Sequence, residues 1–269
     1  MEIWQAILLG FVQGITEFIP VSSSGHLELT QMIFNIPTTE NFHLFLEFIN
    51  IGTLLALLFY FRQRIFKIIR NVFEEHNYKL ALNILITSIP AGLAGLIFAD
   101  LIENTPFFNS IITLTIAMGI VGILMWSIDR LPHLKQLKNE NALSPKRALA
   151  IGLMQTFALI PGTSRSGTTI VAGRLMGLST ESSAEYSFLA SIPIMCGVCL
   201  KIFLSESSRN YFFNNLVLLT ISNLVALIVG LLALKFLLSY LKKPGSLQSF
   251  GRYRVVLACI VLGVTLILM

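Results

Sequence analysis

One short segment near the start of the chain holds the side chains best suited to acid–base or nucleophilic chemistry. Glu17 lies four residues after Gln13, so the two side chains share one face of a helix. Ser23 offers a hydroxyl nucleophile, and His26, three residues on, offers a base or an acid. Glu17 could orient the histidine, activate the serine or hold a divalent cation. We favour a catalytic role over the plainer interpretation, a packed histidine in an apolar protein.

A second segment, residues 159–169, has the composition of an anion-binding turn. It reads Leu-Ile-Pro-Gly-Thr-Ser-Arg-Ser-Gly-Thr-Thr, and the first segment carries a similar Ser-Ser-Ser-Gly run at residues 22–25. Serine and glycine at a helix start expose backbone N–H groups, and the helix dipole adds partial positive charge. The guanidinium of Arg165 is suited to phosphate oxygens. The plainer alternative is that the small residues only permit close helix packing and that Arg165 pairs with Glu17.

We therefore predict one site that binds a phosphate-bearing molecule and acts on it. Its predicted catalytic residues are Glu17, Ser23, His26 and Arg165. Its predicted binding residues are Gln13, Ser22, Ser24, Gly25, Ser164, Ser166, Gly167, Thr168 and Thr169.

The two segments match one another at a constant shift in numbering. The matched pairs include Gly10 with Gly152, Gln13 with Gln155, Ser22 with Ser164 and Gly25 with Gly167. The pattern predicts an internal repeat of about residues 1–140 and 141–269 within a single membrane domain, 1–269.

The elements that must position these residues follow from composition. The chain has 269 residues, of which 55% are hydrophobic and only 12% charged, and its mean hydropathy is +0.77. A soluble domain has about 25% charged residues. This composition excludes a cytosolic enzyme, a secreted disulfide protein and a disordered regulator. The net charge of +5 reports membrane topology, so we expect no nucleic-acid partner.

The predicted fold is an all-α polytopic membrane protein with six spanning helices. Each span needs about 20 mostly apolar residues. The predicted spans are about 42–61, 81–100, 107–128, 186–204, 213–241 and 253–269. Two further stretches, 3–36 and 147–178, are apolar but interrupted by proline, glycine and polar residues, which predicts two re-entrant helical hairpins.

Loop charges predict the orientation of these spans. Segments 62–79, 129–147 and 242–254 are basic, the last through Lys242, Lys243, Arg252 and Arg254, and basic loops stay in the cytoplasm. Segments 101–106 and 205–212 are not basic and are expected outside. The hairpins would then enter from opposite faces, as in an inverted repeat, which places a site near the membrane midplane.

The two motifs also resemble those of the undecaprenyl-diphosphatase family of bacterial membrane enzymes. The family motifs (E/Q)xxxE and PGxSRSxxT stand complete here at residues 13–17 and 161–169, and the similarity extends over essentially the whole chain. Gln13 occupies a position that is Glu in some members, so this chain has one carboxylate fewer there.

The resemblance implies dephosphorylation of undecaprenyl diphosphate to undecaprenyl phosphate, the lipid carrier for peptidoglycan precursors. It implies a multi-pass protein of the bacterial plasma membrane with its site facing outward. Bacitracin would compete by sequestering the substrate, so the enzyme would give resistance to this drug. It also implies Mg²⁺ or Ca²⁺, with Glu17 as the one available ligand; no dedicated cage is expected if the metal is held mainly by substrate oxygens.

Two questions stay open at the level of sequence. The nucleophile could be Ser23, His26 or a water molecule. The alternative function is a lipid-phosphate flippase or anion transporter, which needs the phosphate clamp but no nucleophile. A channel is less favoured, since no filter-like motif is present. The oligomeric state is not readable from the sequence.

Overall fold

The computed structural model describes residues 1–108, 110–130 and 134–268. The side chains of Glu40, Ala99, Asp100, Glu103 and Leu268 lie outside the described part. The side chains of Asp100, which borders the predicted outer segment 101–106, and of Glu103, which lies within it, are therefore not placed by the structure.

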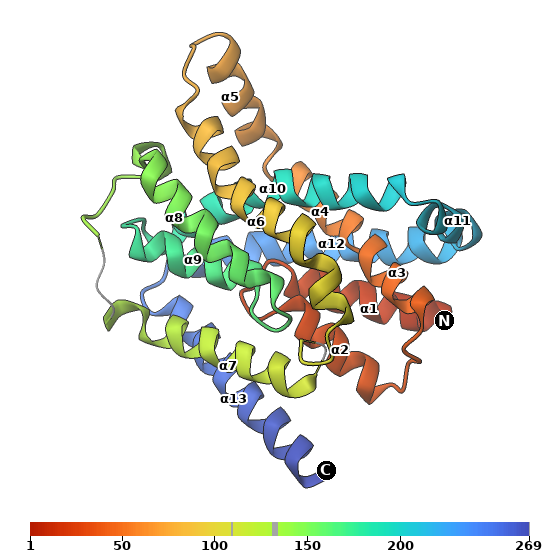
Figure 1. The fold of residues 1–269 in the computed structure, drawn as a ribbon. Helices are drawn as coiled ribbons and strands as arrows, with labels where there is room; N and C mark the ends of the chain where they lie inside the picture. Colours follow the sequence, from red (N-terminus) through yellow and green to blue (C-terminus); the bar gives the residue numbers. More distant parts are fainter. Residues whose placement is uncertain (109, 131–133, 269) are drawn as a thin grey trace.

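The described residues form helices and contain no strand (Figure 1). The helices of the first half are α1 (Ile3–Thr16), α2 (Ser23–Ile33), α3 (Glu40–Phe48), α4 (Asn50–Tyr60), α5 (Arg62–Phe73), α6 (Lys79–Asn104) and α7 (Ile111–Ser127). Short 3₁₀ helices η1 (Ile128–Arg130) and η2 (Glu140–Ala142) follow. The second half holds α8 (Pro145–Gln155), η3 (Thr156–Leu159), α9 (Arg165–Leu175), α10 (Thr180–Leu204), α11 (Glu206–Asn214), α12 (Leu216–Leu241) and α13 (Ser246–Leu268).

Six helical segments are long and apolar enough to cross a membrane, which confirms the predicted number of spans. They are Asn41–Tyr60, Lys79–Phe98, Ile111–Arg130, Thr180–Leu204, Leu216–Leu241 and Ser246–Ile267. The fourth span begins earlier than predicted because Ser179 caps it, its side chain accepting a hydrogen bond from the backbone N–H of Ser182. The sixth also begins earlier, at Ser246, so the predicted basic segment 242–254 is largely helix.

The first span is interrupted in its middle. Helix α3 ends at Phe48 and α4 begins at Asn50, with Ile49 between them. The side-chain amide of Asn50 donates hydrogen bonds to the carbonyls of Leu46 and Glu47, at 2.9 and 3.3 Å. These bonds fix the Asn50 side chain and leave its oxygen free to accept from another helix.

The spans pack across the two halves of the chain. Helix α12 packs against α1 and α4 of the first half, and α6 packs against α8 and α10 of the second. Helices α7 and α13 lie side by side at the lower edge of Figure 1. This crosswise exchange of helices is what a two-fold repeat would produce. The repeat itself stays a prediction.

Two helix–turn–helix segments lie within the stretches 3–36 and 147–178, and their re-entrant character stays a prediction. The first is α1 and α2 joined by residues 17–22, and the second is α8, η3 and α9 joined by residues 160–164. Helix α1 packs against α12, and α8 packs against α6. The hairpins are thereby held against spans, while their depth in a bilayer stays a prediction.

Candidate functional site

The turns of the two hairpins have the same local geometry. Ser22 and Ser164 precede the second helix of their hairpins with positive φ angles of 78° and 71°, a conformation that residues other than glycine rarely adopt. The Ser22 hydroxyl accepts a hydrogen bond from the N–H of Gly25, and the Ser164 hydroxyl accepts one from Gly167, at 3.4 and 3.2 Å. Each serine therefore caps its helix, and strained residues of this kind cluster at functional sites.

The two turns lie in direct contact. The hydroxyl of Ser24, in the first turn of helix α2 directly after the first hairpin turn, accepts a hydrogen bond of 3.5 Å from the N–H of Gly162 in the second hairpin turn. Gly162 has φ +89°, and a Cβ built on it would lie 2.1 Å from the carbonyl oxygen of Leu114 on α7. Only glycine fits this turn, which is therefore pressed against α7.

A buried arginine joins the two turns to α7. Arg254 on α13 is fully buried, and its guanidinium donates to four carbonyls, those of Pro20, Gly162, Thr163 and Met118, at 3.3, 2.8, 3.0 and 3.1 Å. The interpretation of Arg254 as a loop charge is wrong. The signal that could have identified it was its position at the start of an apolar span, where a buried charge is costly and functional.

Glu17 is the centre of a polar cluster that unites both hairpins. One carboxylate oxygen, Oε1, accepts from Nη2 of Arg165 at 2.6 Å. The other, Oε2, accepts from the Ser23 hydroxyl at 2.8 Å and from the side-chain amide of Gln13 at 3.1 Å. The side chains of Glu17 and Arg165 are only 10% and 23% exposed. The ion pair between Arg165 and Glu17, which the helix-packing alternative predicts, is therefore present. The Ser23 hydroxyl donates to the same carboxylate, which that alternative does not predict.

Asn50 is a member of this cluster that sequence reasoning missed. Its side-chain oxygen accepts a hydrogen bond of 2.8 Å from the Gln13 amide, which also donates to Glu17. Gln13 is 1% exposed, so this bond fixes its amide in one orientation. A lone asparagine within an apolar span was the available signal.

His26 has partners of its own, apart from the Glu17 cluster. Its Nδ1 lies 2.8 Å from the carbonyl of Ser22, and its Nε2 lies 2.7 Å from the hydroxyl of Tyr253 on α13. Among the residues that the structure describes, no hydrogen bond joins His26 to Ser23 or Glu17. A carbonyl only accepts, so Nδ1 carries the hydrogen, and in the neutral ring Nε2 accepts from Tyr253.

The neutral form of this ring is favoured by its surroundings. Helix α2 is not one of the six candidate spans, and burial lowers the pKa of the His26 imidazole below its usual 6.5. The bond to Ser22 works in the opposite direction, and the charge of Arg254 lowers the pKa further. The His26 ring is therefore neutral near neutral pH, with its Nε2 lone pair accepting from Tyr253.

The remaining predicted binding residues shape the turns. The hydroxyls of Thr168 and Thr169 donate to the backbone carbonyls of Ser164 and Arg165, at 2.9 and 2.8 Å, and Thr169 also bonds to Ser187 on α10. Ser166 lies 3.3 Å from the hydroxyl of Ser164. These side chains are buried and hold the start of α9, so the second turn would meet a ligand through Arg165 and backbone N–H groups.

The residues at this site do not fit a resident divalent cation. Glu17 is the one carboxylate in the cluster, and its two oxygens already accept three hydrogen bonds. Within the described parts of the chain there is no group of three or more His, Cys, Asp or Glu side chains that could hold a metal ion. A cation would also face the guanidinium of Arg165 at close range.

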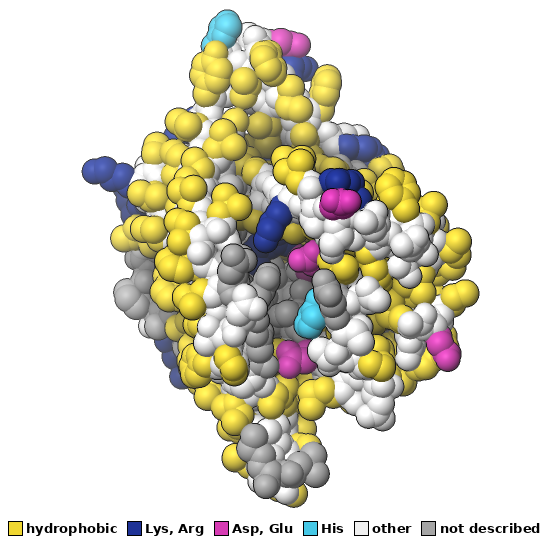
Figure 2. Space-filling view, turned by 45° about the vertical axis from the view of Figure 1, so that its right-hand side comes forward, with side chains coloured by type: hydrophobic (Ala, Val, Ile, Leu, Met, Phe, Trp, Pro, Cys, Tyr) yellow, Lys and Arg dark blue, Asp and Glu magenta, His cyan; other side chains and the backbone are white. Residues whose placement is uncertain are grey.

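Figure 2 shows a hollow on one face of the molecule, in which basic, acidic and histidine side chains gather among hydrophobic ones. Fold and site together define the class: an all-helical, multi-pass membrane protein with a serine, a carboxylate and a guanidinium joined between two hairpin turns.

The particular family follows from comparison with known proteins. The family model described as bacitracin resistance protein BacA matches residues 6–260, so the chain belongs to that family. Undecaprenyl-diphosphatase 1 of Clostridioides difficile is 37% identical over 97% of this chain and 96% of its own length. The undecaprenyl-diphosphatases of Thermodesulfovibrio yellowstonii and Enterococcus faecalis are 40% and 35% identical, each over 97% of this chain and over 96% and 97% of their own.

Proposed function

We propose that this protein is a membrane phosphatase that hydrolyses undecaprenyl diphosphate to undecaprenyl phosphate and inorganic phosphate. The family and the names of its relatives support this activity over the flippase or transporter alternative. The single observation that carries the chemistry is the hydrogen bond from the Ser23 hydroxyl to Glu17, with Arg165 on the other oxygen of the same carboxylate. A carrier would need the guanidinium but not the activated hydroxyl.

The first chemical step follows from this geometry. Ser23 Oγ attacks the terminal phosphorus of the diphosphate while Glu17 Oε2 takes the hydroxyl proton. The bond between that phosphorus and the bridging oxygen breaks, and undecaprenyl phosphate leaves with the bonding electrons. In this account Ser23 is the nucleophile, because its hydroxyl already donates to a carboxylate that can take its proton, whereas among the described residues His26 has no hydrogen bond to that carboxylate.

Arg165 stabilises the charge that develops on the phosphoryl oxygens. Among the described residues, the hydrogen bonds of its guanidinium, to Glu17 and Met195, come from Nη2. Nη1 and Nε remain as N–H donors for phosphate. The first N–H groups of α2 and α9, which lack partners within their helices, add further donors at the two turns. Charge stabilisation of this kind is the larger part of phosphoryl-transfer catalysis.

The second step releases the phosphate from the enzyme. Water attacks the phosphoserine, the P–Oγ bond breaks, and the proton retained by Glu17 returns to Ser23. The base that we propose for this water is His26: its Nε2, which accepts from the Tyr253 hydroxyl in the structure, takes the water proton once that hydroxyl turns away, and the proton then passes to the departing phosphate.

Any divalent cation in the reaction would arrive on the substrate. We propose this because the diphosphate offers the oxygen ligands that Mg²⁺ and Ca²⁺ prefer, whereas the protein offers one occupied carboxylate. None of the steps above uses a cation.

The location is proposed to be the bacterial plasma membrane, with the site opening outward and the basic segments in the cytoplasm. The relatives and the family description also support bacitracin resistance through competition for the lipid substrate. Labelling of Lys242→Cys, in a variant lacking Cys196, Cys199 and Cys259, tests the orientation. A membrane-impermeant maleimide should react only in broken cells, and reaction in intact cells would reverse the proposed topology.

Phosphate release from farnesyl diphosphate by the detergent-purified chain tests the activity. The Glu17→Gln variant keeps the shape of the side chain but cannot take a proton, so kcat should fall by about 10²–10⁴-fold. The control is Glu206→Gln, an exposed carboxylate on α11 outside both proposed sites, which should retain full activity. Equal turnover by Glu17→Gln and the wild type would reject Glu17 as the base. No phosphate release by the wild type would reject the activity.

A further inference from the structure

Helix α5 is strongly amphipathic and lies outside the helix bundle. None of its residues is buried, and Figure 1 shows it projecting at the top with the start of α6. Phe66, Ile69 and Phe73 are 67%, 48% and 74% exposed, and hydrophobic side chains cover this projection in Figure 2. A helix with basic residues on one face and large apolar residues on the other is typical of a membrane interface.

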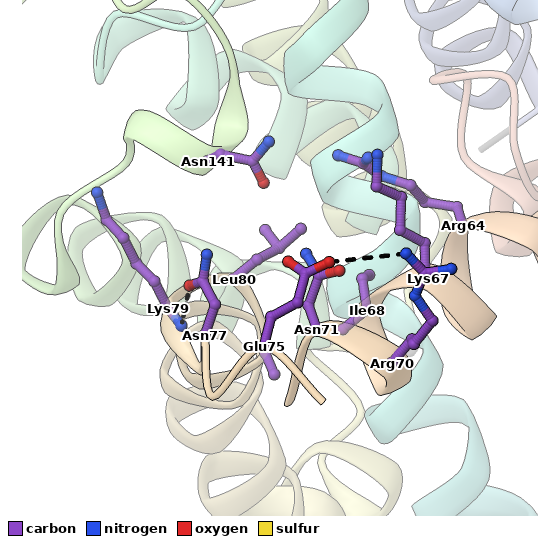
Figure 3. A pocket seen from close by; sticks show the side chains of 11 residues that line it. Arg64, Lys67, Ile68, Arg70, Asn71, Glu75, Asn77, Lys79, Leu80 and Asn141 are labelled. Atoms are coloured by element: carbon purple, nitrogen blue, oxygen red, sulfur yellow. Dashed lines mark hydrogen bonds and ion pairs between the residues drawn. The ribbon is translucent and has the colours of Figure 1, made fainter. Parts of the chain in front are cut away.

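A cavity of about 400 Å³ lies between α5, the start of α6 and η2 (Figure 3). Four basic side chains line it, together with Glu75, Asn71 and Asn141, and Figure 3 shows them arranged around one space. The basic residues are Arg64, Lys67, Arg70 and Lys79.

The charges of this cavity are only partly neutralised by the protein. Arg64 pairs with the buried Glu140, and Arg70 pairs with Glu74 and Glu75 at 3.3 and 3.7 Å. Within the described residues the ammonium groups of Lys67 and Lys79 have no ion pair. Two lysines therefore face the cavity with their charges uncompensated.

Two residues that line the cavity also hold a buried polar atom without a partner among the described residues. The side-chain oxygen of Asn71 and the Nε of Arg64 are both buried, and neither has a hydrogen-bond partner among the described residues. Unsatisfied buried groups cost free energy unless a ligand or water completes them.

We propose that this cavity binds the phosphate headgroup of an anionic membrane lipid. The cationic lining selects the phosphate, and the exposed apolar face of α5 beside it accommodates the acyl chains. A free phosphate ion would use the same cations but would gain nothing from Phe66, Ile69 and Phe73. The cavity lies outside the Glu17 cluster, so binding here is independent of the proposed hydrolysis.

Native mass spectrometry of the full chain in detergent tests the proposal. The probes are phosphatidylglycerol and phosphatidylcholine with identical acyl chains. A Lys67→Gln, Lys79→Gln double variant should bind phosphatidylglycerol about thirtyfold more weakly, at about 1 kcal/mol for each charge removed, and each single variant about fivefold more weakly. Both lysines are exposed, so these variants should fold like the wild type.

The matched control is Lys135→Gln, Lys138→Gln, which removes the same two charges from an exposed segment that does not line the cavity. It should keep nearly the wild-type affinity, and phosphatidylcholine should bind weakly to all forms. Equal losses of affinity in the two double variants would overturn the proposal, because the loss would then follow from the lower net charge and not from the cavity. Displacement of phosphatidylglycerol by millimolar inorganic phosphate would overturn the assignment to a lipid.

Discussion

Glu17 is the residue on which the other polar side chains of the site depend. It accepts from Arg165, Ser23 and Gln13 at once, so one carboxylate orients a proposed nucleophile and a proposed phosphate ligand. The sequence predicted this grouping for Gln13, Glu17 and Ser23, because their spacing within one hairpin restricts their geometry. The sequence could not place Asn50 or Tyr253, because no local pattern links residues so far apart along the chain.

The geometry of His26 shows the limit of such local reasoning. Its spacing from Ser23 suggested a direct serine–histidine pair, but the ring bonds back to Ser22 and across to Tyr253. A spacing of three residues places two side chains near each other on a helix, yet their partners depend on which helices lie opposite.

The fall of activity at low pH tests the role of the hydrogen bond between Tyr253 and His26. A hydroxyl that donates to Nε2 stabilises the neutral imidazole, so Tyr253→Phe should raise the pKa of His26. Because a buried imidazole has its pKa lowered, the wild type should lose kcat/KM only below pH 6.5. In Tyr253→Phe the loss should begin about 0.4–1 pH unit higher, the equivalent of one hydrogen bond. Tyr240→Phe on α12 is the control, and an identical profile for Tyr253→Phe would exclude the proposed base.

At the scale of elements, the turns are held by close backbone approach. Ser22 and Ser164 adopt positive φ, and Gly162 lies against the carbonyl of Leu114, so the hairpin ends have little freedom to move. The sequence predicted two such turns from proline, serine and glycine, and helices begin and end near the predicted positions. It did not predict that α5 forms a separate amphipathic helix, because segment 62–79 was interpreted by its charge alone.

A single methyl group should disrupt the second turn. In Gly162→Ala the new Cβ would lie 2.1 Å from Leu114 O, and the residue would be held at φ +89°. We expect a loss of at least about 1–3 kcal/mol of stability from the backbone conformation alone, together with weaker activity as Arg165 moves. The measurement is the thermal midpoint in detergent. Gly92→Ala, with open space around its Cβ, is the control and should be neutral or slightly stabilising. Equal midpoints for the two variants would contradict the tight turn.

At the scale of the whole molecule, the site is formed by helices from both halves of the chain, because helices of each half pack against helices of the other. Helices α12 and α6 each pack against elements of the other half, and Arg254 on α13 binds both turns and α7. Composition and hydropathy were sufficient to predict the six spans, since about 20 apolar residues admit few other structures. Which spans touch depends on side-chain packing that hydropathy does not encode.

Arg254 should therefore be essential to the integrity of the bundle. Arg254→Met keeps a long unbranched side chain but removes the guanidinium. Four buried carbonyls then lose their donor. We expect a loss of about 3 kcal/mol or more, which corresponds to a fall in the thermal midpoint of about 6–12 °C. The neighbouring Arg252 is exposed, so Arg252→Met should change the midpoint little. A stable Arg254→Met variant would show that the carbonyls find other partners.

The central claim is that Ser23 of one hairpin and Arg165 of the other act as one catalytic unit. A double-mutant cycle of Ser23→Ala and Arg165→Ala measures this directly through kcat/KM for farnesyl diphosphate. Each single variant should lose about 10³-fold or more, Arg165→Ala at least as much as Ser23→Ala, and the double variant should be little worse than the poorer single one. Losses that simply multiply, or near-native turnover by purified Arg165→Ala, would contradict the account.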